Sequence, residues 1–194
     1  MGADIENFIG TCDVCVFLSC NSKKESLLSY PLSVRPWERV GCDLFPFGGH
    51  HYLVCYDDFS NWIEVGSVDN SSSSSVISKL TFIFARLGVP DALVSHSIPF
   101  GIYELANFSK EWNFKLVLIG RRHTEKWFGI AKNILRISYK SGHDVSYALL
   151  EYRNTAIAQV GLSPAQIMLG SILKSKLPCV VDQLLPVAIN YSWL

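Results

Sequence analysis

Three strand-like runs follow one another between residues 37 and 68, and their order constrains the fold more than any other feature of the chain. They read WERVGCDLF, HYLVCYD and NWIEVGSV, and each is rich in β-branched and aromatic residues. Gly-Gly-His-His separates the first run from the second, and Asp-Asp-Phe-Ser separates the second from the third. Such runs, joined by short stretches of turn-forming residues, predict an antiparallel meander of three strands.

Helical and strand-like patterns alternate after residue 70. The serine run 71–75 is expected to begin a helix, because apolar residues at helical spacing follow it and a glycine and a proline end the pattern. The apolar positions are Val76, Leu80, Ile83 and Leu87. The next elements are a strand over ALVSH, a helix through YELANFSKEW, a strand over FKLVLI, a long helix from about Thr124 to Tyr139, and a helix over DVSYALLEYRN that closes the core. The order predicts an α/β domain with a mixed five-stranded sheet, three strands antiparallel and the later ones parallel, flanked by helices.

Composition limits what the chain can bind. Of its 194 residues, 49% are hydrophobic. Because 17 Lys and Arg balance 17 Asp and Glu, any DNA binding must come from a local patch of positive charge. No apolar run reaches the roughly 18 residues of a membrane span, and Asp4 and Glu6 lie where a secretion signal carries cations. We therefore expect an intracellular chain with no membrane partner. The six cysteines are too sparse for a disulfide scaffold, which predicts reduced thiols.

Three positions carry groups that could do chemistry. Asp43 lies inside the first strand, His96 ends the ALVSH run shortly before Pro99, and Glu125 opens the long helix. Strand alternation that points Asp43 at solvent would avoid the cost of burying an unpaired carboxylate. A carboxylate in the first turn of a helix is favoured by the helix dipole. Taken singly, Asp43 and Glu125 therefore have ordinary structural explanations.

The motifs around these positions match one family in order over about residues 11 to 178. They are RPWERVGCDLF, YLVCYDDFSNWIEV, IFARLGVPDALVS, LANFSKEWNF, EKWFGIAKNIL and YRNTAIAQVGLSPAQIMLG. The chain resembles the integrase core of gypsy-type retrotransposons, a relative of retroviral integrase, and the integrase-like genes that vertebrates have domesticated from such elements. The resemblance implies a ribonuclease H-like fold, a role in DNA integration, a nuclear location and assembly as a homo-oligomer. The domains expected are a truncated zinc-binding remnant over 1–30, a linker over 31–36, the catalytic core over 37–178 and a C-terminal tail over 179–194.

The family cuts and joins DNA with two aspartates and a glutamate that hold two divalent cations, Mg²⁺ or Mn²⁺. By resemblance, Asp43 stands at the first aspartate, His96 at the second aspartate and Glu125 at the glutamate. The family motif Val-Ser-Asp-Asn-Gly-Pro-Gln-Phe reads VSHSIPF here, and GRRHT replaces a longer loop before the glutamate. One of three negative charges is missing and Mg²⁺ prefers oxygen ligands, so we expect the metal pair to be weak or absent and the chain to be inactive.

Two alternatives remain open for this site. One is an active polynucleotidyl transferase in which Asp43, His96 and Glu125 bind a softer cation such as Mn²⁺ or Zn²⁺. The other is a non-catalytic protein-interaction module.

Cys12 and Cys15 have the C-x₂-C spacing of half a zinc site. In the family, two upstream histidines complete the ligand set, whereas the first histidine of this chain is His50. Cys20 offers a third thiolate, and no fourth ligand is evident. We therefore expect a truncated, metal-free module.

The long helix and the residues before it carry a local charge of +5 between residues 121 and 140. The cations are Arg121, Arg122, Lys126, Lys132, Arg136 and Lys140, against one acidic residue, Glu125. Helical spacing places Lys132 and Arg136 on the face of Glu125. In the family this helix approaches the DNA, and a basic stripe binds phosphates without catalysis. A solvated helix face with cations near its C-terminal end explains the pattern equally well.

Overall fold

The computed structural model describes residues 11, 33–95, 103–118, 125–158 and 160–189. The chain divides into two compact units, Met1–Pro31 and Leu32–Leu194. All the elements described below belong to the second unit.

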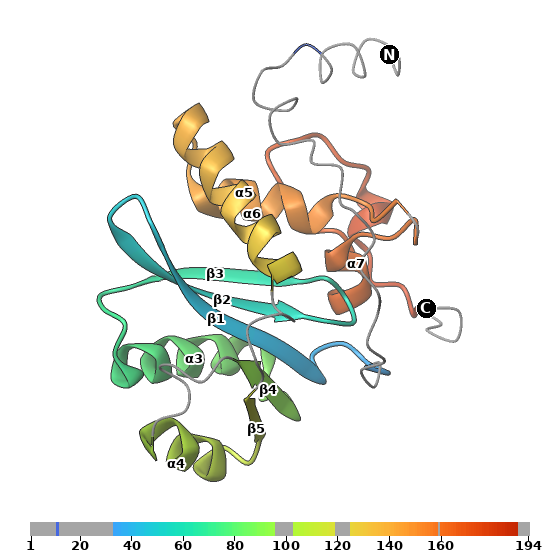
Figure 1. Cartoon of the computed structure of the whole chain (residues 1–194). Helices are drawn as coiled ribbons and strands as arrows, with labels where there is room; N and C mark the ends of the chain where they lie inside the picture. The colour runs from blue at the N-terminus through green and yellow to red at the C-terminus, as the bar shows by residue number, and fades with distance from the viewer. Residues whose placement is uncertain (1–10, 12–32, 96–102, 119–124, 159, 190–194) are drawn as a thin grey trace. The chain divides into compact units, whose positions relative to one another are not determined.

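A five-stranded mixed sheet forms the centre of this unit (Figure 1). Its strands are β1 (Arg39–Phe47), β2 (His50–Asp57), β3 (Ile63–Val68), β4 (Ala92–Ser95) and β5 (Lys115–Leu118). They lie in the order β3-β2-β1-β4-β5, with β1, β2 and β3 antiparallel and with β4 and β5 parallel to β1. The predicted meander followed by parallel strands is therefore confirmed.

Helices cover both faces of the sheet (Figure 1). They are α3 (Ser73–Leu87), α4 (Tyr103–Glu111), α5 (Glu125–Ser141), α6 (Val145–Asn154), α7 (Pro164–Leu169) and the 3₁₀ helix η2 (Val181–Leu184). Side chains of α3 and α4 pack on one face around Val40, Leu53 and Leu93. Side chains of α5 and α6 pack on the other face around Val54 and Phe45. Successive residues of a strand point to opposite faces, so Leu44 of β1 packs in the first core and Phe45 in the second.

The serine run begins α3, as its pattern predicts. The side chain of Ser72 accepts a hydrogen bond from the backbone N–H of Ser75 and so caps the helix. Val76 and Leu80 are fully buried in the core beneath α3. The helix ends at Gly88, whose φ of 87° lies in the left-handed region that favours glycine.

The structure corrects the predicted connection between the first two strands. The second strand was expected to begin at His51, within the separating stretch Gly-Gly-His-His, but β2 already begins at His50, and β1 extends through Pro46 to Phe47. The turn consists of Gly48 and Gly49 alone, with φ of 57° and 80°. Two successive left-handed residues form the tight hairpin turn that matches the twist of antiparallel strands, so no further residues are needed.

One helix extends the core beyond the expected last element. Ser163 accepts from the backbone N–H of Gln166, whose side chain in turn accepts from the backbone N–H of Ser163, and this capping box starts α7. Ala165 and Ile167 are buried. The core therefore extends past the helix over 144–154 to include α7 and Leu173.

Candidate functional site

Asp43 lies on β1, near the middle of the sheet, directly opposite Val54 of β2. Its side chain is partly exposed, and its Oδ1 accepts a hydrogen bond of 2.6 Å from the backbone N–H of Leu44. Strand alternation puts Asp43 on the same face as Phe45, which packs with residues of α5 and α6. The first predicted carboxylate is therefore on the side of the sheet that α5 covers.

The end of β4 lies beside this part of β1. Ser95 is the parallel register partner of Cys42, and its buried hydroxyl donates a 2.7 Å hydrogen bond to the carbonyl of Cys42. Asp43 follows Cys42 and His96 follows Ser95. The register partners Cys42 and Ser95 therefore each stand one residue before a predicted site residue. His96 itself lies outside the described residues, and its place at the site remains a prediction.

Cys42 does not replace the missing carboxylate. It packs in the core on the α3 side of the sheet, and its Sγ is 3.3 Å from the Sγ of Cys55. Burial raises the pKa of the Cys42 thiol well above its ordinary value, and the hydrogen bond with Cys55 and the charge of Asp43 raise it further. Metals bind the thiolate, so this protonated, inward-facing thiol is no ligand.

Helix α5 brings the third predicted position to the same face of the sheet. Its first residue is Glu125, and its side chains Ile134 and Leu135 pack against Val54 of β2. The side chain of Glu125 is not among those described, so the convergence of Asp43, His96 and Glu125 is not tested. In the described part of the chain, no three His, Cys, Asp or Glu side chains are grouped as metal ligands would be. Cys12 and Cys15, the predicted zinc half-site, also lie outside that part.

The cationic face of α5 contacts β1 at Phe45, on the same face of the sheet as Asp43. Lys132 Nζ is 5.7 Å from the centre of the Phe45 ring, and Phe45 is two residues from Asp43 on the same face of β1. Arg136 and Lys140 are exposed further along the helix. Arg121 and Arg122 precede the described part of α5, and of Lys126 only the backbone is described. The structure thus places one predicted cation within reach of the candidate site and two more on the solvent side of the same helix.

An exposed aromatic residue, not predicted from the sequence, lies on this face. The Tyr139 side chain is 78% exposed, and its ring meets the Phe47 ring edge-on at 6.1 Å between centres. Tyr139 is seven residues after Lys132, a spacing that places both on one helix face and was available from the sequence. The surface formed by Lys132, Arg136, Tyr139 and Lys140 is called the α5 face below.

Solved structures share this architecture. The catalytic core domain of HTLV-2 integrase, in complex with magnesium and in a trimeric form, aligns over 69% of this chain and 97% of its own length, with a TM-score of 0.59 and 20% identity. A dimeric form of the same domain aligns equally well over 96% of its length. The integrase chain of a simian T-cell lymphotropic virus intasome, in complex with the PP2A regulatory subunit B56 gamma, aligns over 98% of this chain and 73% of its own, with a TM-score of 0.65 and 16% identity.

The chain has the fold of an integrase catalytic core. The ribonuclease H-like fold and the likeness to the integrase core, both predicted from the sequence, are confirmed. No protein-family model matches the integrase-like chain. A curated protein of Caenorhabditis elegans, the uncharacterized protein K02A2.6, is 29% identical over 96 residues, which are 49% of this chain and 8% of the worm protein. In the described part of the integrase-like chain, no helix is long and apolar enough to cross a membrane.

Proposed function

We propose that this integrase-like core binds duplex DNA through the α5 face and does not catalyse strand transfer. The observation that carries the proposal is the contact of Lys132 with Phe45, which shares a face of β1 with Asp43, and the continuation of this surface along the exposed side of α5 by Arg136, Tyr139 and Lys140. Cations spaced along one helix suit the phosphates of a DNA backbone, and an exposed tyrosine beside them adds a surface for stacking or hydrogen bonding. Because the whole chain has no net charge, this local face would supply the attraction.

The donor set argues against retained catalysis. Two Mg²⁺ ions at one site need several carboxylate oxygens, and the sequence supplies two carboxylates, Asp43 and Glu125, with an imidazole at position 96. The set therefore does not fit a pair of Mg²⁺ ions, and Cys42 is not available as a further anionic ligand. The proposal includes an origin from a gypsy-type element, a nuclear location and a homo-oligomer; the magnesium-bound integrase cores of HTLV-2 are themselves trimeric and dimeric.

DNA binding should fall steeply with salt, and the α5 face should set that dependence. Reversing one charge, as in Lys132→Glu or Arg136→Glu, should weaken binding about tenfold and reduce the slope of log affinity against log salt by about 1, because each cation displaces roughly one counterion from a phosphate. The measurement is fluorescence anisotropy with a labelled duplex over a series of salt concentrations.

Lys110→Glu is the matched control. Lys110 is exposed in the last turn of α4, which packs on the opposite face of the sheet. The proposal fails if duplex binding is absent, if it is insensitive to salt, or if the Lys110 variant loses as much affinity as the α5 variants. If none of the variants loses DNA binding, and a protein partner binds the α5 face instead, the interaction-module alternative is favoured.

A further inference from the structure

Strand β3 forms one edge of the sheet, and part of its backbone faces outward. The Trp62 carbonyl accepts a 2.9 Å hydrogen bond from the N–H of Asp57 on β2, which sets the alternation along β3. By this alternation Glu64, Gly66 and Val68 bond to β2, and Ile63, Val65 and Ser67 direct their N–H and C=O groups away from the sheet. Arg153 donates to the Ile63 carbonyl at 2.8 Å and 3.1 Å and so covers the start of the edge. Val65 and Ser67 have register partners on β2, but in the described part of the chain no strand lies on the outer side of β3 to pair with their outward groups.

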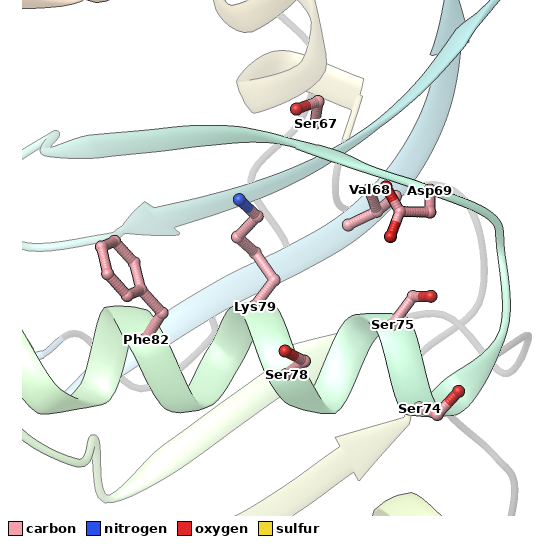
Figure 2. Close-up of a pocket in the computed structure, with 8 residues that line it drawn as sticks. All are labelled: Ser67, Val68, Asp69, Ser74, Ser75, Ser78, Lys79 and Phe82. Atoms are coloured by element: carbon pink, nitrogen blue, oxygen red, sulfur yellow. The ribbon is translucent and has the colours of Figure 1, made fainter.

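A cleft of about 580 Å³ lies between this edge and α3 (Figure 2). Its lining residues are Ser67, Val68 and Asp69 at the end of β3, and Ser74, Ser75, Ser78, Lys79 and Phe82 on α3. Helix α3 runs back along the strand, so Ser75 lies near the end of β3, Phe82 lies toward its start, and Lys79 reaches from the helix toward the strand between them (Figure 2). The cleft therefore offers three different side-chain environments in a row.

Lys79 lies against the middle of β3. A Cβ added to Gly66 would be 2.9 Å from Cε and 3.1 Å from Nζ of Lys79, so the missing side chain of Gly66 makes the space that the lysine fills. The side chain is half-buried, and no carboxylate in the described part of the chain pairs with it, although Asp69 lines the same cleft. A half-buried lysine that no described carboxylate pairs with, beside an open strand edge, attracts an acidic group.

We propose that the outer edge of β3 binds an extended peptide of a partner protein as an added antiparallel strand, with an acidic side chain opposite Gly66. Main-chain hydrogen bonds to Val65 and Ser67 would hold the peptide, and alternate side chains would select it. A residue opposite Gly66 points to the α3 side of the sheet and meets Lys79.

The neighbouring alternate positions of the peptide meet different surfaces. The position opposite Glu64 lies toward Phe82, whose ring is 61% exposed and carries the Arg86 guanidinium at 4.9 Å, so an apolar side chain suits it. The position opposite Val68 lies toward Ser75, so a small polar side chain suits it. Because an antiparallel strand runs opposite to β3, the partner motif is small polar, any, acidic, any, apolar. This surface lies on the α3 side of the sheet, so the proposal does not depend on DNA binding through α5.

The test uses the peptide acetyl-Thr-Ser-Val-Glu-Val-Leu-Thr-amide and the whole chain labelled with ¹⁵N. Its two valines lie opposite Ser67 and Val65, and its glutamate opposite Gly66. Titration to roughly 1 mM peptide should shift the backbone amide signals of Val65 and Ser67 in a saturable way. N-methylation of the two valines removes donors that face β3 and should abolish binding, whereas N-methylation of the glutamate, whose N–H faces away, should leave it intact.

Charge reversal tests the role of Lys79 without depending on the stability of the variant. Lys79→Glu should weaken the peptide about tenfold, and a peptide with lysine in place of glutamate should bind this variant better than it binds the original chain. Lys115→Glu, at an exposed lysine on the opposite edge strand β5, should leave the affinity unchanged. The proposal is overturned if the amide signals do not shift, if they still shift with the peptide N-methylated at its valines, or if Lys79→Glu leaves the peptide affinity unchanged. It is also overturned if the amide signals of Val65 and Ser67 shift with protein concentration alone, because a second copy of the chain would then occupy the edge.

Discussion

Replacing Glu64 with alanine should lower the free energy of unfolding by about 3 kcal/mol or more. Glu64 is only 5% exposed on β3. Its carboxylate accepts from Trp62 Nε1 at 2.9 Å and forms ion pairs with Arg86 at 2.9 Å and Arg153 at 3.0 Å. Trp62 lies immediately before β3, Arg86 is on α3 and Arg153 is on α6, so one side chain connects helices on both faces to the edge of the sheet.

The large effect is expected because the partners stay behind. Burial lowers the pKa of the Arg153 guanidinium, while the charge of Glu64 opposes that shift, so the alanine variant leaves a cation in a poorly solvated place without its counter-ion. Arg153 also stacks on Trp62, with its guanidinium carbon 4.3 Å from the ring centre, and this contact would be disturbed. Arg86 is half exposed and should lose little.

Urea denaturation of the purified chain measures the effect. Glu111→Ala is the control, because Glu111 is an exposed glutamate at the end of α4 and its loss should change stability by no more than about 0.5 kcal/mol. Glu64→Gln keeps the acceptor for Trp62 and should fall between the two. If Glu64→Ala and Glu111→Ala change the free energy of unfolding equally within error, the contacts of Glu64 with Trp62, Arg86 and Arg153 contribute nothing to stability, contrary to this prediction.

Local patterns predicted most of the fold because they act within a few residues. The apolar spacing of α3 and its serine cap are written in one stretch of chain, and the alternation of β1 to β3 is equally local. The predicted connection between the first two strands was too long, because two left-handed glycines complete the turn. The polar residues that follow them, His50 and His51, are compatible with the exposed end of a strand. The capping box of α7, Ser163 and Gln166, is also a local pattern and would have predicted this helix.

The candidate site depended more on the resemblance than on local pattern. No periodicity shows that Ser95 is the register partner of Cys42, since the two residues are 53 positions apart in the sequence. The contact of Lys132 with Phe45 likewise joins distant parts of the chain. The sequence presents Glu64 only as one position of the strand-like run NWIEVGSV, because the arginines that allow its burial are 22 and about 90 residues away. Long-range partners of this kind become visible only in the folded chain.

Changing His96 to aspartate should raise the affinity for Mg²⁺ by about 100-fold. A third carboxylate about 4 Å from a cation contributes several kcal/mol at an effective dielectric constant near 20, and about 2.8 kcal/mol corresponds to that factor in affinity. The register supports the placement, because β4 ends one residue before position 96 beside the strand that carries Asp43. Isothermal titration calorimetry with Mg²⁺, repeated with Mn²⁺, measures the change.

Two further variants serve as controls for His96→Asp. His143→Asp adds the same charge at an exposed position between α5 and α6 and should leave Mg²⁺ affinity near that of the original chain. Asp43→Asn combined with His96→Asp should lose the gain, because both positions are proposed to hold the same ion. A gain that persists without Asp43, or that His143→Asp reproduces, would mean that the added charge acts non-specifically.

Strand transfer separates the inactive site from the altered one. The original chain, given a labelled DNA end, target DNA and Mg²⁺ or Mn²⁺, should give no joined product, since a site short of one negative charge holds a cation pair poorly and an imidazole offers Mg²⁺ a nitrogen it disfavours. Joined product that disappears in Asp43→Ala would instead establish a working Asp, His and Glu site. Duplex binding that survives in both cases would follow from the α5 face, because its cations need only phosphates and not a metal.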